Sequence, residues 1–216
     1  MSKKIIFTSM FIAIIFSFNR STLAESRWEY WTSFGFTESV NDKVTITVAP
    51  ELRYRGGMSN HYYTHFDIGF DWKVNDWLVI GPYYRHVEEK KNSDWKIEYQ
   101  PNINATVKFN LFGIDFSDRN RIEYRIKEDD DFYRYRNKIT AKFKKMTQFD
   151  IRPYVAEEPF YDFDADEFNK NRMYAGFSCT IFEKLKTDVY YILESRRSNN
   201  HWTEVNVFGI NFRYPF

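Results

Sequence analysis

The sequence predicts an all-β, single-domain protein: an antiparallel up-and-down β-barrel that spans a membrane and follows a cleaved signal peptide. Two observations carry this prediction. Aromatic residues make up 20% of the chain beside 28% charged residues, and apolar and polar residues alternate along most of it. In a transmembrane barrel, aromatic side chains gather at the lipid interfaces while charged ones face the lumen or the loops. A soluble core would not need both classes in such numbers.

The first element is the segment 1–24, which has the pattern of a secretory signal peptide. Two lysines precede an apolar stretch over 5–18, and small residues lead to Ala24. This stretch is shorter than the roughly 20 residues of a membrane-spanning helix. We therefore expect cleavage after Ala24 and a mature barrel over 25–216. Without the three basic residues of the leader, 28 basic residues face 30 acidic ones, a net charge of −2, which does not favour a nucleic-acid partner.

The mature chain contains eleven segments in which apolar and polar side chains alternate as on the two faces of a strand. These segments are 28–37, 43–55, 61–73, 77–88, 94–109, 112–127, 132–145, 148–158, 168–182, 186–196 and 201–216. Bacterial single-chain barrels have even strand numbers with both chain ends on the periplasmic side. We therefore expect about twelve strands, with ten as the alternative. Asp118 and Asn120 break the alternation, which predicts either a register shift there or a local error in the assigned lipid face.

The last segment has the pattern of a membrane-spanning final strand. Phe208, Ile210, Phe212, Tyr214 and Phe216 form one apolar row, which suits lipid. The aromatic ending Phe212, Tyr214 and Phe216 resembles the signal that the outer-membrane assembly machinery reads. We therefore expect a bacterial outer-membrane protein whose partners are that machinery, outer-membrane lipids and lipopolysaccharide. With Phe216 at the periplasmic rim, connections near 56–60, 89–93, 128–131, 159–167 and 197–200 lie outside, and those near 74–76, 110–111, 145–147 and 183–185 lie in the periplasm.

Two of the expected outer connections are acidic. Glu128 to Asp131 form one, and the second runs from Glu157 and Glu158 through Asp162, Asp164 and Asp166 to Glu167. Carboxylate oxygens bind hard divalent cations, so these connections predict cation bridges to lipopolysaccharide phosphates. Solvated loop charge is the alternative interpretation.

The densest charge pattern predicts an ion-paired lumen. On two consecutive strands, Arg-x-Arg-x-Glu-x-Arg over 119–125 would stand beside the basic residues of 134–138. Glu51, Glu98, Glu157, Glu158 and Glu194 are the expected compensating anions, because buried cations require partners. The predicted lumen network is Glu51, Arg53, Glu98, Arg119, Arg121, Glu123, Arg125, Arg134, Arg136, Lys138, Glu157, Arg172 and Glu194.

Two functions use the same lumen residues. In the structural interpretation, arginine and glutamate side chains fill the lumen and fix the strand register. In the porin-like interpretation, they line a narrow conduit for a small solute or ion, and rings of arginine favour anions. Ten to twelve strands lie between filled eight-stranded barrels and open porins of sixteen or more.

Several sequence patterns resemble a known family. They are Arg-x-Arg-x-Glu-x-Arg over 119–125, Tyr-Arg-Tyr-Arg-Asn over 133–137, Pro153-Tyr154 leading to Glu157-Glu158-Pro159-Phe160, and the segment 171–176. The chain is similar to domain-of-unknown-function family 2490, bacterial outer-membrane barrels. That family carries no established activity, so the resemblance implies fold and location but no catalytic residues.

Two alternatives remain at this point. Some barrels of this size act on lipids with a serine and a histidine, but the chain has no His-x-Ser pair of the outer-membrane phospholipase kind, so no catalytic residue is predicted. A soluble secreted β-sandwich binding protein is the fold alternative. Cofactors and metals are not predicted: His61, His65 and Asp67 would be spread along one strand face, and Cys179 has the pattern of a buried free thiol. Oligomeric state is not defined by the sequence.

Overall fold

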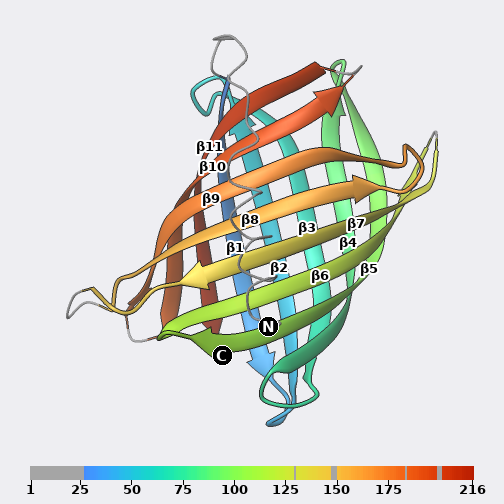
Figure 1. Ribbon diagram of the computed structural model, residues 1–216. Helices are drawn as coiled ribbons and strands as arrows, with labels where there is room; N and C mark the ends of the chain where they lie inside the picture. The colour runs from blue at the N-terminus through green and yellow to red at the C-terminus, as the bar shows by residue number, and fades with distance from the viewer. Residues whose placement is uncertain (1–26, 129, 147–149, 183, 199–200) are drawn as a thin grey trace, which may run out of the picture.

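Residues 27–128, 130–146, 150–182, 184–198 and 201–216 are described by the computed structural model of the protein. They form one closed barrel of eleven strands (Figure 1). The expected signal peptide, 1–24, lies outside the described residues. The strands are β1 (Arg27–Ser39), β2 (Val44–Arg55), β3 (Asn60–Lys73), β4 (Leu78–Lys91), β5 (Asp94–Leu111), β6 (Ile114–Lys127), β7 (Phe132–Lys142), β8 (Arg152–Asp162), β9 (Glu167–Ile181), β10 (Leu185–Ser198) and β11 (His201–Pro215).

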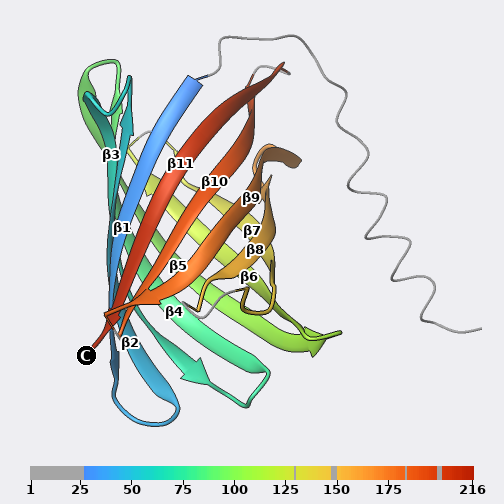
Figure 2. The ribbon, with the colours of Figure 1, turned by 90° about the vertical axis from the view of Figure 1, so that its left-hand side faces the viewer.

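The barrel closes through a parallel pair. Each strand pairs with the next in antiparallel fashion, whereas β1 and β11 run parallel, from Arg27 opposite Val205 to Thr37 opposite Pro215. Figure 2 shows β11 beside β1, with the C-terminus at the end opposite to the start of β1. Eleven described strands lie within the expected range of ten to twelve. The expected correction from eleven strands to twelve is not needed, because the parallel pairing of β1 with β11 closes a sheet of eleven strands.

The parallel closure gives the barrel two distinct rims. The N-terminal rim holds Arg27 and the β2–β3, β4–β5, β6–β7, β8–β9 and β10–β11 connections. The C-terminal rim holds Pro215 and the remaining connections. This grouping matches the two sets expected from the sequence. The expectation that both chain ends lie on one side is wrong for the described chain, since Arg27 and Pro215 mark opposite rims.

The outer wall is apolar and rich in aromatic contacts. Phe34 and Phe212 stack across the β1–β11 seam with ring centroids 5.3 Å apart, and Phe109 and Phe116 stack across β5–β6 at 5.1 Å. These rings are exposed on the outside of the barrel; Phe34, for example, is 42% exposed. Such pairs contribute to strand pairing and leave an apolar outer surface.

Prolines interrupt four of the ladders. Pro50, Pro82, Pro101 and Pro159 each lie where the pairing with one neighbouring strand skips two positions. Proline lacks the N–H that a ladder needs. Each proline keeps a partner on its other side, as Pro159 does opposite Asn171, so the sheet stays closed.

Two local expectations are corrected by the register. Strand β8 runs over Arg152–Asp162 and not over 148–158, because Pro159 is accepted inside the strand. The pairing of β6 with β7 is unbroken from Asp115 to Arg125, so no bulge resets the register at Asp118 and Asn120. Both residues face outward, and the expected lipid face is polar at this place.

Candidate functional site

Three glutamates with 0% exposure point into the lumen: Glu123, Glu158 and Glu194. Glu123, on β6, accepts hydrogen bonds from Arg134 Nη2 at 2.5 Å and Arg136 Nη1 at 3.1 Å. Both arginines lie on β7, directly across the β6–β7 ladder. Every second side chain of these strands points inward, and this alternation places Glu123 next to Arg134 and Arg136.

Arginine side chains join these glutamates into one network. Arg136 also lies 2.8 Å from Glu158 on β8, which receives Arg119 Nη2 at 2.8 Å and the Tyr174 hydroxyl at 2.6 Å. Arg172, on β9, lies 3.5 Å from Glu158 and donates from Nε to Glu194 at 2.5 Å. The network therefore runs through five consecutive strands, β6 to β10.

The network reaches the barrel seam through Glu29 on β1. Arg196 donates to both Glu194 and Glu29. Glu29 also accepts hydrogen bonds from Trp31 Nε1 at 3.0 Å and from the Tyr62 hydroxyl. Strands β1, β3 and β10 are thus tied together at one carboxylate, near the point where the parallel pair closes the sheet.

Aromatic rings fill the space between these charges. Phe160 is 1% exposed, and the guanidinium carbons of Arg134, Arg136 and Arg172 lie 5.3, 5.0 and 4.9 Å from its ring centroid. Trp31 holds Arg53 over its ring at 3.7 Å. A cation over an aromatic face is stabilised when it is desolvated, so the rings support the charges and also exclude water.

A second set of pairs lines the opposite wall, on β2 to β6. The pairs are Glu51 with Arg53 at 2.7 Å, Asp67 with Arg85 at 2.6 Å and Glu98 with Arg125 Nη2 at 2.7 Å. His65 is 5% exposed and lies between Glu51 and Asp67 at 3.6 and 3.8 Å. Buried carboxylates are thus paired on both walls, as burial of charge requires.

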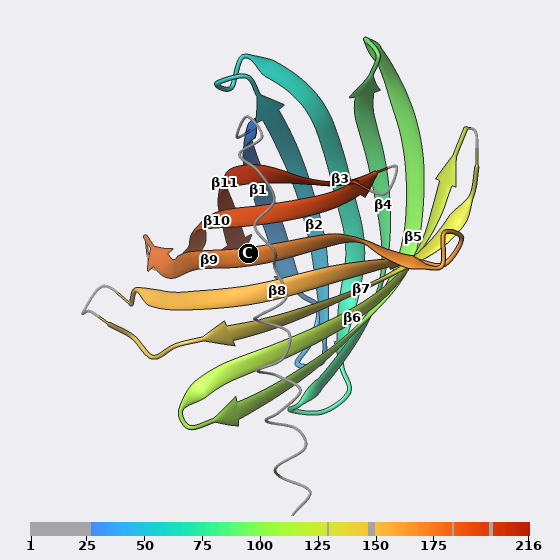
Figure 3. The same cartoon turned by 45° about the horizontal axis from the view of Figure 1, so that its top comes forward.

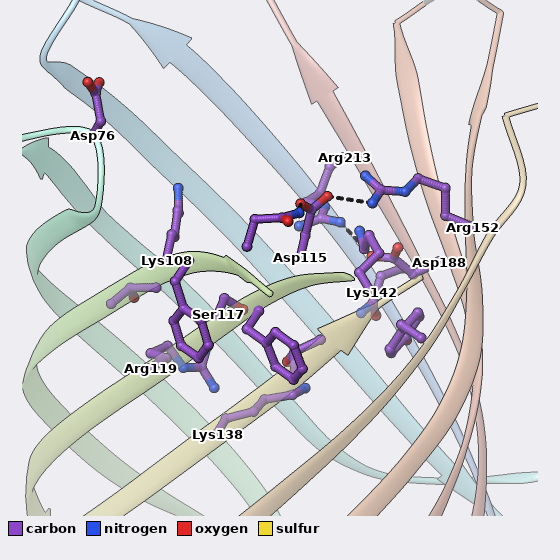
Figure 4. A pocket seen from close by; sticks show the side chains of 17 residues that line it. Asp76, Lys108, Asp115, Ser117, Arg119, Lys138, Lys142, Arg152, Asp188 and Arg213 are labelled. Atoms are coloured by element: carbon purple, nitrogen blue, oxygen red, sulfur yellow. Dashed lines mark hydrogen bonds and ion pairs between the residues drawn. The ribbon is translucent and has the colours of Figure 1, made fainter. Parts of the chain in front are cut away.

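The lumen is narrow among the network residues and wider at one end. Two small spaces of about 200 and 210 Å³ lie among the network residues. A larger cavity of about 910 Å³ lies toward the C-terminal rim, and we call it the vestibule (Figure 4). Six basic side chains line it, Lys108, Arg119, Lys138, Lys142, Arg152 and Arg213, beside three acids, Asp76, Asp115 and Asp188.

Some of the charged side chains that line the vestibule form ion pairs with one another. Arg152 contacts Asp115 and Arg213 contacts Asp188, each at 2.5 Å. Lys138 lies over the Tyr174 ring at 3.6 Å, and Lys142 donates to Ser178 at 3.2 Å. Figure 4 shows Arg119 and Lys138 together at one end of the cavity, away from the pair of Arg152 and Asp115. The vestibule therefore carries a net positive lining.

Most of the predicted lumen residues face the lumen. Glu51, Arg53, Glu98, Arg119, Arg121, Glu123, Arg125, Arg134, Arg136, Lys138, Arg172 and Glu194 all do so. Glu157 is the correction: it pairs with Ile139 and Met173 and bonds Asn171 on the outside of the barrel. Glu158 takes the inward position. Both glutamates lie within β8, so the expected acidic connection keeps only Asp162, Asp164, Asp166 and Glu167.

Sequence reasoning left several ion-paired lumen residues out of the predicted network. Glu29, Asp67, Arg85 and Arg196 are among them. Alternation around Trp31 and His65 could have assigned the face of both acids. Arg85 lies directly opposite Asp67 on the next strand. The partner of Glu29 could not be found in this way, because Arg196 reaches Glu29 across the seam between the two ends of the chain.

The apolar outer wall and the ion-paired interior define a β-barrel protein with a filled, charged lumen. Residues 28–205 match the family described as Protein of unknown function (DUF2490). The chain belongs to this family. No curated protein and no solved structure gives a significant match.

Two features are absent from the described residues. None of their segments forms a helix with the length and apolar character needed to cross a membrane. No group of three or more His, Cys, Asp or Glu side chains among them is placed to hold a metal ion. Cys179 is a half-buried free thiol on β9.

Proposed function

We propose that this protein is an integral barrel of the bacterial outer membrane whose lumen is closed at mid-height by the arginine–glutamate network. The apolar, aromatic outer wall supports the membrane location, because lipid-facing bands of transmembrane barrels have this composition. The single observation that carries the closed lumen is the full burial of Glu123, Glu158 and Glu194. On this proposal the main role of the barrel interior is structural.

A narrow anion conduit is the second candidate, and the vestibule favours it. The six basic side chains around the cavity of about 910 Å³ outnumber its three acids. Positive lining raises the local concentration of anions. In this version the vestibule collects a small anion, and a rearrangement of the network lets it pass.

The remaining parts of the proposal concern export and partners. Cleavage after Ala24 releases the barrel, the assembly machinery reads Phe212, Tyr214 and Phe216, and outer-membrane lipids and lipopolysaccharide surround the wall. Phe216 donates its backbone N–H to Thr37 at 3.0 Å, which places the end of the chain against β1 at the barrel seam. No catalytic step and no cofactor is part of the proposal.

Single-channel conductance in planar bilayers tests the closed lumen. The native protein is compared with a network variant, Arg121→Ala with Arg136→Ala, and a vestibule variant, Arg152→Ala with Arg213→Ala. A closed barrel gives no steady conductance in the native protein, and the network variant leaks or loses stability. Steady anion-selective current in the native protein, reduced in the vestibule variant, would replace the structural proposal with the conduit.

A further inference from the structure

The outer wall of the described barrel carries a polar patch at the middle of its strands, where a membrane barrel is most apolar. We call Asp118, Asn120, Asn137 and Glu157 the outer patch. Directly paired residues share a face of the sheet, and Asn120 is opposite Asn137, Asp118 opposite Ile139, and Ile139 opposite Glu157. All four patch residues therefore point outward from β6, β7 and β8, which cross the front of the barrel in Figure 3.

The outer patch lies at the middle of the wall. Asn137 is the central residue of β7 (Phe132–Lys142), and Glu157 is the central residue of β8 (Arg152–Asp162). Outward residues near the centres of other strands are apolar, for example Phe34, Ile68 and Ile103, which are 42, 44 and 51% exposed. The patch therefore interrupts an apolar belt.

The side-chain N–H groups of the patch already donate hydrogen bonds to neighbours within the outer wall. Asn137 Nδ2 donates to Asp118 and, at 3.1 Å, to Asn120 Oδ1. The Tyr135 hydroxyl donates to Asn120 Oδ1 at 2.5 Å, and Asn171 Nδ2 donates to Glu157 at 3.1 Å. The carboxylate oxygens of Asp118 and Glu157 therefore remain as acceptors on the outer surface of the patch. Within the described part of the chain, no basic nitrogen forms an ion pair with Asp118 or Glu157.

Two carboxylates facing hydrocarbon are costly, because intramembrane charges require partners. A second copy turned onto the same patch would bring acid against acid. In the described part of the chain, the outward positions near the strand centres hold no lysine or arginine. Charge complementarity therefore points to a different chain that brings a cation.

We infer that the outer patch is the docking site for a membrane-embedded partner protein that presents a lysine or arginine side chain at mid-bilayer depth. The inference rests on the proposed outer-membrane location. Asp118 and Glu157 bind the basic group, and the apolar residues around them, such as Ile139 and Met173, pack against the partner.

The test combines crosslinking in native outer membranes with the stability of the isolated barrel. A photoreactive benzoylphenylalanine replaces Asn137, and the matched control carries it at Ile68 on the opposite wall. We expect a protein adduct from position 137 and lipid labelling from position 68. The adduct must map to a partner peptide with a lysine or arginine inside a membrane-spanning segment. It must disappear when that residue is changed to leucine, and also in the variant Asp118→Leu with Glu157→Leu.

The same double variant separates docking from a structural role. In phospholipid vesicles without the partner, its urea midpoint rises above that of the native barrel, because lipid-facing charge has been removed. A lower midpoint, an adduct of twice the monomer mass, or the same lipid labelling from both positions would overturn the inference. If carbonate washing extracts the protein and position 68 labels no lipid, the proposed membrane location has failed, and the inference falls with it.

Discussion

The guanidinium of Arg136 holds the fully buried carboxylate of Glu158, with Nη2 at 2.8 Å and Nε at 3.0 Å. Arg136 and Glu158 lie on β7 and β8, at a place where Pro159 interrupts the ladder between these strands. The ion pair therefore joins the two strands where backbone hydrogen bonds do not. Because Arg136 also reaches Glu123 on β6, one side chain ties three strands together.

Arg136→Ala should strongly destabilise the barrel. It removes a partner from two buried carboxylates at once, and breaking a buried pair from one side costs about 3–5 kcal/mol. The urea midpoint of the folded protein in lipid vesicles measures the effect. Lys73→Ala is the control, since its pair with Asp76 is exposed and such pairs contribute about 1 kcal/mol or less. Equal effects of the two changes would contradict a stabilising role for the network.

Phe160→Ala should also destabilise the barrel and should open the closed middle of the lumen. The ring is nearly fully buried among three arginines, and truncation of a buried phenylalanine costs about 3–5 kcal/mol. Unfolding in vesicles measures the loss, and conductance detects the opening. Phe168→Ala is the matched control, because this ring is 56% exposed on the outer wall. A Phe160→Ala barrel as stable and as closed as the control would show that the ring does not fill the lumen.

Local alternation explains how much of the lumen could be predicted. Arg121, Glu123, Arg134 and Arg136 lie on adjacent strands with strict alternation, so parity alone turned them inward. Strand β8 offers no such guide, because Tyr154 faces inward and Val155 outward while both are apolar. A shift of one residue moves every side chain to the other face. For this reason Glu157 and Glu158 were both expected as lumen anions, and the predicted network included Glu157 and not Glu158.

Closure of the sheet could not be predicted by the same means. The pairing of β1 with β11 joins the two ends of the chain, and no pattern within either strand specifies a parallel partner. The predicted strand number therefore depended on the rule that bacterial barrels have an even number of strands. The parallel pairing of β1 with β11, in which Arg27 lies opposite Val205, departs from this rule. Asp118 and Asn120 were recognised as exceptions from the sequence, but their outward direction needed the register of both neighbouring ladders.

Deletion of Phe216 should lower insertion into the outer membrane without changing export. The residue stacks on Phe36 with ring centroids 5.9 Å apart, so its loss removes the proposed assembly signal and a contact across the seam. Fractionation of cells into periplasm and outer membrane measures the outcome. Phe216→Tyr keeps a terminal aromatic and serves as the control. Normal insertion of the deleted form would end the assignment of this residue as a signal.

With the proposed membrane location, the parallel closure predicts that the two ends of the described chain are accessible from opposite sides of the membrane. With Cys179→Ser as background, single cysteines replace Arg27, Ser59 and Asn110 in separate variants. Arg27 starts β1 at the rim that holds Ser59, whereas Asn110 precedes the β5–β6 turn at the other rim. A membrane-impermeant thiol reagent added to intact cells should therefore label Arg27→Cys and Ser59→Cys alike, and Asn110→Cys only after the outer membrane is opened. The proposed orientation makes the first two external, and a uniformly inverted result would reverse the orientation alone. Labelling of Arg27→Cys together with Asn110→Cys would instead require an even number of strands and would exclude the parallel seam between β1 and β11.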